Sequence, residues 1–483
     1  MIMFKLTPLT AAILVMVSAQ AMANDSVSNQ NQTGTANVAD VKQSQASYST
    51  ATQQQLGEGN DAAAVQTGAT GAISQDQVGD YNAGYAEQLY EDNSSIIQQQ
   101  NGALNIAHAS QSIGVGGGQV LQQQEGTGNF SFVYQDSQEG TTGQTFQYGD
   151  SNEANIEQIQ LGTYNNAMII QYGSGNYGTA EQVLHNGGQI NINQAGNTNY
   201  AYGDQRNGEG GTLTINQYGD GNGTEVWQDT QLASSATVNQ SGVSNETVVD
   251  QSFGEHNVAQ VFQVGDLNAI YADQFESLSS TVTLYQTGVS NVHFTYQNGD
   301  GHTLTATSVG NDNKVYASDW KGPQKGGQFG SNHVATVSQN GNGNIANFKQ
   351  NDIGNKMATN QTGDRNKTTV TQADTFNELY FDQNGSDNIL IADQRGTANL
   401  AMGSSTGMNN TTDFTQSGTG NEAYTTQNGD DNMITVKQAD TMNVAYVTQD
   451  GTGNIANVDQ SGMTQMATIQ QMGMDNRATV MQQ

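Results

Sequence analysis

Residues 427–460 read QNGDDNMITVKQADTMNVAYVTQDGTGNIANVDQ, and this stretch contains the repeat that decides the fold. Glutamine recurs at every eleventh position, at Gln427, Gln438, Gln449 and Gln460. Glycine or aspartate stands two residues after each glutamine, and asparagine stands five residues after the first three. The position seven residues after glutamine is small or apolar, so the unit is Q-x-G-x-x-N-x-A-x-x-x.

This unit recurs along nearly the whole chain. From Gln328 to the end of the chain, every eleventh position is glutamine except at Ser405, and the asparagine is replaced only by His333 and Gln465. In the first half the clear units recur at roughly double this spacing, with less regular half-units between them. They begin at Gln32, Gln55, Gln77, Gln100, Gln124, Gln147, Gln171, Gln194, Gln217, Gln240, Gln263 and Gln286. The period is therefore a pair of arms of about 22 residues, which is typical of a stacked repeat architecture.

Each unit predicts one strand and one turn. Glycine and asparagine tolerate the positive φ that a tight reversal of the chain requires. Between the turns the side chains alternate: Ala346, Phe348 and Gln350 share one face of the stretch 344–350, and the residues between them share the other. A period of two indicates a half-buried strand, because successive side chains in a strand point to opposite faces.

The composition is unusual for a folded chain of 483 residues. Only 34% of the residues are hydrophobic and the formal net charge is −32, values typical of disorder. The chain has only two prolines, however, and so keeps the backbone N–H donors that a continuous β ladder needs. The negative charge disfavours nucleic acid and anionic lipid as partners. Without cysteine there can be no disulfide, no CxxC zinc site and no thiol nucleophile.

We therefore predict an all-β fold, a β-solenoid of about twenty stacked two-strand coils with amyloid-like cross-β spacing. Identical amides one coil apart, about 4.8 Å, can hydrogen-bond in ladders along the rod. A buried amide left unpaired costs about 1–3 kcal/mol, which makes the register strict. The amides predicted to form the core ladder and to guide polymerisation are Gln339, Asn344, Gln350, Asn355, Gln361, Asn366, Gln383, Asn388, Gln427, Asn432, Gln449, Asn454, Gln471 and Asn476. Asp352, Asp374 and Asp440 replace the turn glycine and are predicted to act as gatekeepers against premature assembly.

Residues 1–23 are predicted to be a signal peptide. Lys5 precedes a short apolar run, and Ala21-Met22-Ala23 is an A-x-A cleavage site. The apolar run is too short for a membrane-spanning helix, which needs about 20 residues. We therefore expect an exported protein that is not inserted in a membrane.

Four segments follow the signal peptide. These are a short N-terminal segment (24–31), repeats of about 23 residues per coil (32–307), an irregular interruption (308–327) and strict 11-residue half-coils (328–483). The interruption contains the only proline after the signal peptide. It is interpreted either as a loop that bulges from one coil or as a hinge or docking site between two solenoid halves.

The repeats resemble a known family. The motif Q-x-G-x-x-N-x-A-x-x-x-Q, repeated from Gln32 to Gln482 after the signal peptide, is similar to the curlin repeat of curli fibre subunits. Aspartate-type turns such as 372–377 alternate with glycine-type turns, as in the second arm of the curlin unit. The resemblance implies a secreted subunit that crosses the outer membrane unfolded through a dedicated pore and is nucleated by a minor subunit. It would then polymerise into extracellular amyloid fibres of the biofilm matrix and serve surface adhesion.

The chain departs from that family in two ways. It is several times longer than a familiar curlin, so each subunit would contribute more coils per joint. Residues 24–31 are also too short to be the glycine-rich segment that resembles the pore-targeting signal of the family. The secretion route and the choice between a major subunit and a nucleator therefore stay open.

The ends of a solenoid point to the same function without the family. Each end is a row of unpaired N–H and C=O groups, and monomeric solenoids cap their ends with polar elements. Neither the first unit at Gln32 nor the last unit before Gln483 has an evident cap. Uncapped ends favour addition into an open filament, and salt or low pH would relieve the charge repulsion.

Other functions fit the sequence less well. The main alternative is a monomeric β-solenoid surface adhesin, which predicts a capped rod. Calcium-binding repeats need a period of nine, and an ice-binding solenoid needs an outward threonine ladder that Thr369 and Thr371 begin and Ile391 breaks. We expect no enzyme, no metal and no cofactor, because the histidines lack ligand spacing and no nucleophile elbow or catalytic triad can be recognised.

Overall fold

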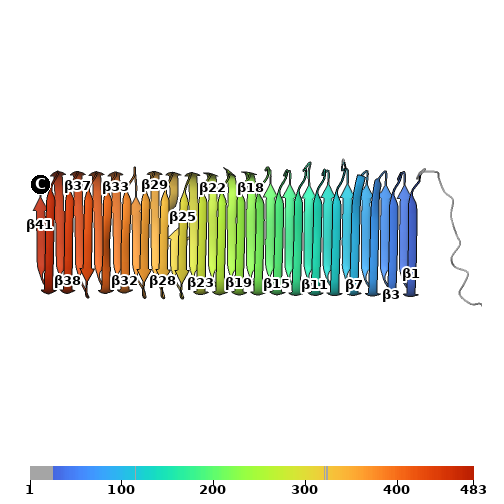
Figure 1. The fold of residues 1–483 in the computed structure, drawn as a ribbon, viewed down its shortest axis with the longest axis horizontal. Coiled ribbons are helices and arrows are strands. Elements are labelled where there is room, and N and C mark those ends of the chain that lie inside the picture. The colour runs from blue at the N-terminus through green and yellow to red at the C-terminus, as the bar shows by residue number, and fades with distance from the viewer. Residues whose placement is uncertain (1–24, 115, 320, 323–324) are drawn as a thin grey trace, which may run out of the picture.

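The computed structural model of this chain describes residues 25–114, 116–319, 321–322 and 325–483. The predicted signal peptide lies outside these residues, as do Trp320 and Pro323 of the interruption. The described chain contains no helix and forms one straight rod of strands, with the N-terminal strands (blue) at one end and the C-terminal strands (red) at the other (Figure 1).

Two parallel sheets run the length of the rod, and the chain visits them alternately. Sheet A consists of β1 (Val27–Thr35), β3 (Thr50–Glu58), β5 (Thr70–Asp80), β7 (Asp92–Ala103), β9 (Gln119–Thr127), β11 (Thr142–Asp150), β13 (Asn166–Ser174), β15 (Gln189–Asn197), β17 (Thr212–Asp220), β19 (Ser235–Val243), β21 (Val258–Asp266), β23 (Thr281–Val289), β25 (Thr303–Val309), β28 (Val334–Asn340), β30 (Lys356–Thr362), β32 (Glu378–Ser386), β34 (Leu400–Met408), β36 (Glu422–Asn428), β38 (Val444–Thr452) and β40 (Met466–Met474). Sheet B consists of β2 (Val38–Ser44), β4 (Asp61–Thr67), β6 (Ala83–Leu89), β8 (Ile106–Ser112), β10 (Phe130–Asp136), β12 (Glu153–Ile159), β14 (Tyr177–Val183), β16 (Tyr200–Arg206), β18 (Gly223–Leu232), β20 (Glu246–Glu255), β22 (Ala269–Leu278), β24 (Val292–Asp300), β26 (Lys314–Ala317), β27 (Gly327–Ser331), β29 (Ile345–Ile353), β31 (Lys367–Gln372), β33 (Ile389–Thr397), β35 (Thr411–Thr419), β37 (Met433–Thr441), β39 (Ile455–Met463) and β41 (Arg477–Gln482).

The coils stack in register, glutamine over glutamine. Gln427 in β36 pairs with Gln449 in β38, which pairs with Gln471 in β40. Pairing is parallel, because each coil brings the chain back to the same sheet in the same direction. The predicted β-solenoid of about twenty coils is confirmed.

The core is a narrow apolar layer between the sheets. In β29 the alternate residues Ala346, Phe348 and Gln350 are buried, as the sequence pattern predicts, and their neighbours face outward. The same alternation continues from coil to coil, so that alanine, valine, isoleucine, leucine and phenylalanine form one continuous cluster along the rod. Burial of each such side chain contributes about 1.5–3 kcal/mol for the larger residues, which compensates for a sequence poor in apolar residues.

The glycine of the repeat is required by the turn geometry. Gly451 has a φ of 126°, a conformation that L side chains rarely adopt. A Cβ atom at this position would also overlap the carbonyl oxygen of Gly473 in the next coil. At Gly451, close backbone stacking therefore requires a residue without a side chain.

A loop leaves the coil within the interruption and returns to it. The short strands β26 and β27 both pair with β24 on one side and β29 on the other. Gln328 in β27 accepts from Gln297 at 2.8 Å and donates to Gln350 at 2.9 Å, so the ladder is continuous across the inserted residues. Among the described residues of this loop, Lys321 contacts the outer face of sheet B, with its Nζ 4.4 Å from the ring centroid of Tyr271.

Candidate functional site

A line of glutamine amides runs along the inner face of each sheet. Gln427 Nε2 donates to Gln449 Oε1 at 3.2 Å, and Gln449 Nε2 donates to Gln471 Oε1 at 2.8 Å. Gln449 Nε2 also donates to the carbonyl of Met433 in sheet B, at 3.1 Å. One amide therefore joins its coil both to the next coil and to the opposite sheet.

Asparagine forms a second kind of ladder at the turns. The backbone N–H and the side-chain Nδ2 of Asn366 both donate to Asn344 Oδ1, at 3.0 and 3.2 Å. Asn366 Nδ2 also donates to the carbonyl of Gly385 in the next coil, at 2.9 Å. A buried backbone N–H needs a partner, which explains why the turn repeats asparagine at this position.

The two kinds of ladder run in opposite directions. Glutamine donates toward the C-terminal end of the rod, and asparagine donates toward the N-terminal end. The C-terminal end therefore presents amide donors on Gln471 and Gln482 and an acceptor on Asn476. The N-terminal end presents acceptors on Gln32 and Gln43, whose amide groups donate to the next coil. Two rods are thus complementary head to tail, whereas two like ends would place donors against donors or acceptors against acceptors.

The predicted core amides lie in these ladders. All of them are buried except Asn476, which lies in the last coil. Gln339 donates to Gln361 at 2.9 Å in sheet A, and Gln350 donates to Gln372 at 2.8 Å in sheet B. The strict 11-residue spacing thus alternates between the two sheets.

Serine stands in the glutamine line of sheet A at Ser308 and Ser405. The Ser308 hydroxyl donates to Gln339 Oε1 at 2.8 Å, and the Ser405 hydroxyl donates to Gln427 Oε1 at 2.7 Å. A hydroxyl therefore supplies the donor that the next glutamine needs, and Ser308 Oγ also lies 2.8 Å from His293 Nε2 of the opposite sheet.

The three predicted gatekeeper aspartates occupy the turn and hold its backbone. Asp352, Asp374 and Asp440 have φ values of 72°, 67° and 69°, which are smaller than the 126° of Gly451 at the same place in the unit and lie near the left-handed conformation that aspartate tolerates. Their carboxylates accept backbone N–H groups of the next coil: Asp374 Oδ2 accepts from Gly396 at 2.8 Å, and Asp440 Oδ2 accepts from Gly462 at 2.9 Å. Each aspartate thus provides a hydrogen bond as well as a negative charge at the edge of the rod.

A part of this repeat matches a known family model. Residues 407–439 match the model of the curlin associated repeat. The chain carries a curlin associated repeat. The matched stretch contains the ladder residues Gln416, Gln427 and Gln438 and confirms the resemblance predicted from the motif. No curated protein matches the chain.

Two histidines replace asparagine in a turn ladder outside the matched curlin repeat. His302 and His333 are buried, and their rings stack with centroids 5.1 Å apart. His333 Nδ1 accepts the backbone N–H of Asn355 at 3.1 Å, and its Nε2 donates to the carbonyl of Phe329 at 2.9 Å. Burial lowers the pKa of His302 to about 4 and also lowers the pKa of His333. The position of His302, five residues after Gln297, is the sequence signal that could have identified it.

The first coils contain an additional glutamine line that the repeat unit did not reveal. Gln53 donates to Gln75 at 2.8 Å, Gln75 to Gln98 at 2.7 Å and Gln98 to Gln122 at 2.8 Å. Each of these residues lies two positions before a glutamine of the main line, where most later coils have an aliphatic residue, such as Ile169 or Ile469. The recurring Gln-x-Gln, first within β1 and again within β3, was the available sequence signal.

One edge of the rod has wider turns in the N-terminal half. Near the ends of β18, β20 and β22 the chain contains one residue more than the curlin unit, and Thr230, Phe253 and Glu276 adopt φ values of 53°, 56° and 47° where the unit has glycine. The extra residue explains why these half-units look degenerate in the sequence.

Inside these wide turns, coils with a large buried side chain alternate with coils that have glycine. Glu91, Gln138, His185 and Gln231 are buried, and the coils between them have Gly114, Gly162, Gly208 and Gly254 at the same place. A Cβ atom on Gly208 would lie 3.0 Å from the His185 ring and 2.5 Å from the carbonyl oxygen of Gln231. Every second coil therefore makes room for the side chain of its neighbour.

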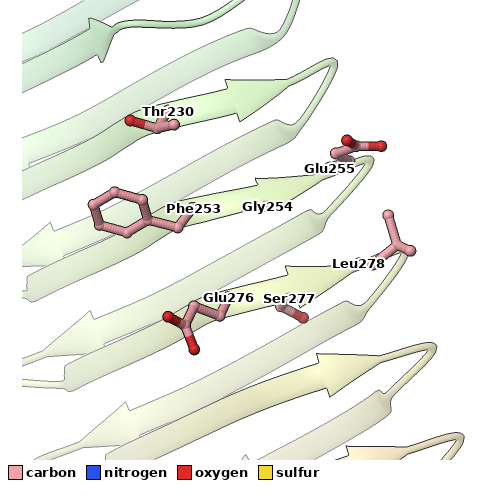
Figure 2. Close-up of a pocket in the computed structure, with 7 residues that line it drawn as sticks. All are labelled: Thr230, Phe253, Gly254, Glu255, Glu276, Ser277 and Leu278. Carbon is pink, nitrogen blue, oxygen red and sulfur yellow. The ribbon is translucent and has the colours of Figure 1, made fainter.

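The wide turns leave shallow hollows on the surface. One of about 400 Å³ is lined by Thr230, Phe253, Gly254, Glu255, Glu276, Ser277 and Leu278 (Figure 2). Its carboxylates, on Glu255 and Glu276, come from successive coils and have no histidine or lysine among the lining residues. Across the described ranges, no group of three or more His, Asp or Glu side chains could hold a metal ion, and no helix could cross a membrane. The ladders and the two rod ends are therefore the candidate functional site.

Proposed function

We propose that this protein is a secreted structural subunit whose rods join end to end into extracellular, curli-like amyloid fibres. The observation that carries the proposal is the complementarity of the two ends. In the described residues, β1 and β2 at one end and β40 and β41 at the other each pair with a strand on one side only. Unpaired parallel strands with matching amide ladders favour the addition of another coil.

The family match supports this assignment. Proteins with a curlin associated repeat are typically extracellular, and residues 407–439 match that repeat. In this proposal the fibre belongs to a biofilm matrix and serves adhesion, a minor subunit nucleates it, and the chain leaves the cell through an outer-membrane pore.

The negative charge regulates the assembly in this proposal. A chain with a net charge of −32 repels its own copies at long range, and salt or low pH reduces that repulsion. The aspartates of the turns place part of this charge at the rod edge, close to the strands that must pair.

Seeded assembly tests the proposal. Residues 24–483 are purified in denaturant, the denaturant is diluted out, and pelletable mass is followed with and without preformed fibre fragments. A lag that seeds shorten, together with fibres that diffract near about 4.8 Å, is the expected result. A soluble β-rich rod that does not respond to seeds would instead support a monomeric solenoid adhesin.

A further inference from the structure

At the N-terminal end of the rod, the additional glutamine line begins with an amide acceptor. Gln30 lies two residues before Gln32 in β1 and begins the additional glutamine line. Its Nε2 donates to Gln53 Oε1 at 2.9 Å. Within the line each Oε1 accepts from the coil before it, as Gln75 Oε1 does from Gln53 at 2.8 Å. Gln30 Oε1 is therefore the acceptor that this line presents to the next rod.

At its other end the same line is closed by hydroxyl groups. Gln122 Nε2 donates to Ser131 Oγ at 2.8 Å, and Ser131 Oγ lies 2.6 Å from Thr145 Oγ1 in the following coil of sheet A. Inside the chain, the transition from glutamine to aliphatic residues is thus made through polar groups. A direct contact between an amide and an aliphatic side chain would leave the amide without its partner.

The C-terminal coil of this chain does not offer a donor to Gln30. In β40 the residue two positions before Gln471 is Ile469, and in β41 the residue two positions before Gln482 is Val480. A second copy stacked in either orientation therefore places an aliphatic side chain on Gln30 Oε1. Sheet B by contrast fits its own copy, since β2 and β41 have alanine, valine and glutamine at the same three inward positions.

We propose that Gln30 makes the N-terminal end of the rod selective for a solenoid coil that carries Gln-x-Gln, supplied by a subunit other than this chain. The inference rests on the proposed end-to-end assembly and names the partner of its first joint. The extra glutamine of the partner donates to Gln30 Oε1, as Gln30 itself donates to Gln53. An unmatched buried acceptor weakens an equilibrium roughly tenfold, so a joint with the partner is tighter than a joint between copies by about that factor.

Changes on either side of the joint test this selectivity in the full-length mature chain. The Q30I variant makes the N-terminal end aliphatic and matches Ile469. The V447Q/I469Q variant extends a glutamine line to the C-terminal end, where the buried Thr425 Oγ1, which has no hydrogen-bond partner among the described residues, can donate to the new amide at position 447. The measured quantity is the concentration of soluble chain that remains when assembly has reached its plateau, which equals the dissociation constant of the end joint.

Either change alone should lower the residual soluble concentration roughly tenfold, and the two combined should raise it again, because the mismatch is then restored with the partners exchanged. Fibre ends of V447Q/I469Q, fixed to a surface, should retain the unmodified chain at concentrations where unmodified ends do not. T448Q, on the exposed outer face of β38, is the matched control and should leave the concentration unchanged.

The outcomes separate the two proposals. Equal residual concentrations for all variants would overturn the selectivity of Gln30 while leaving end-to-end assembly intact. A complete lack of pelletable polymer, in the unmodified chain as well, would overturn the assembly itself. If V447Q/I469Q does not regain β structure, Q30I against the unmodified chain decides alone. The buried Gln53 acceptor that Q30I leaves without its donor is covered in the free rod as well as in the joint, so its cost does not change the dissociation constant of the joint.

Discussion

His333 accepts the backbone N–H of Asn355 on its ring Nδ1 at 3.1 Å, and Asn355 Oδ1 in turn accepts the backbone N–H of Asn377 at 2.9 Å. An imidazole thus performs the function of an amide within one continuous ladder. The His333 Nε2 donates to the carbonyl of Phe329 at 2.9 Å. These bonds require the neutral ring with its hydrogen on Nε2, since a proton on Nδ1 would face the N–H of Asn355.

The first prediction is that stability falls in mild acid. Burial lowers the pKa of His302 to about 4; His333 lowers this pKa a little further, and Asp300 raises it slightly. Burial also lowers the pKa of His333. Above pH of about 6.5 both rings are neutral in the folded and unfolded chain, and their contribution is fully present. As the pH falls toward 4, the unfolded chain binds protons on these histidines that the folded chain excludes. The free energy of unfolding therefore falls, by on the order of 3 kcal/mol for His302. Guanidinium unfolding at pH 7.5 and pH 5 measures this loss.

A variant with asparagine at both histidine positions isolates the effect. H302N/H333N keeps the ladder and removes the titration, whereas the many carboxylates remain the same in both proteins. It should therefore lose less stability between pH 7.5 and pH 5 than the unmodified chain does. An equal loss in both proteins would show that His302 and His333 do not control the response.

The second prediction concerns the amide ladder itself. Replacement of Gln449 by alanine removes bonds to Gln427, Gln471 and Met433 and leaves buried amide groups unpaired. Each orphaned group costs about 1–3 kcal/mol, so Q449A should lower the free energy of unfolding and slow fibre growth in a seeded thioflavin or pelleting assay. R477A, on the outer side of β41, is the control and should have little effect on either quantity. Similar losses in both variants would contradict a dominant role of the ladder.

Much of the fold could be predicted because its determinants are local. The alternation in 344–350 and the spacing of glutamine follow directly from strand geometry, and Ala346, Phe348 and Gln350 are buried as expected. The opposite directions of the glutamine and asparagine ladders could not be predicted, because they depend on where the carbonyl groups of the other sheet lie. The Nε2 of Gln449, for example, donates to the carbonyl of Met433, which lies 16 residues earlier in the chain and in the other sheet.

The wide turns were missed for a different physical reason. The motif assumes that asparagine follows glutamine by five residues, but Gln251 is followed by Asn257. The extra residue is accommodated because Phe253 adopts a φ of 56°, a conformation expected of glycine. Sequence patterns assign such a position to a loop, whereas the stacking of neighbouring coils holds the side chain in this conformation.

The third prediction concerns the glycines between the buried side chains of the wide turns. A Cβ atom on Gly208 would contact the His185 ring at 3.0 Å and the carbonyl oxygen of Gln231 at 2.5 Å. Overpacking of this kind costs about 1–3 kcal/mol, so G208A should lower the thermal midpoint of the soluble rod. A Cβ atom on Gly223 in β18 would have no atom within 4 Å, and G223A should be neutral or slightly stabilising. If the thermal midpoint of G223A fell as much as that of G208A, the effect would come from the lost flexibility of glycine and not from packing.

The fourth prediction separates the charge of the turn aspartates from their hydrogen bonds. The variant D352N/D374N/D440N keeps a side-chain oxygen that can accept the backbone N–H groups of Asp374, Gly396 and Gly462, but removes three negative charges from the rod edge. If these aspartates oppose premature assembly, the lag before fibre formation should shorten, and added salt should shorten it by a smaller factor than in the unmodified chain.

The control for this prediction removes the same charge elsewhere. D382N/D450N/D459N changes three exposed aspartates on the faces of β32, β38 and β39 and lowers the net charge equally. Because repulsion between solvated charges decreases over about 10 Å at 0.1 M salt, charges on the sheet faces should matter less than charges beside the turn backbone that stacks from coil to coil. The control should therefore shorten the lag less than the turn variant. Equal lags would mean that net charge alone restrains assembly and that the position of Asp352, Asp374 and Asp440 has no special effect.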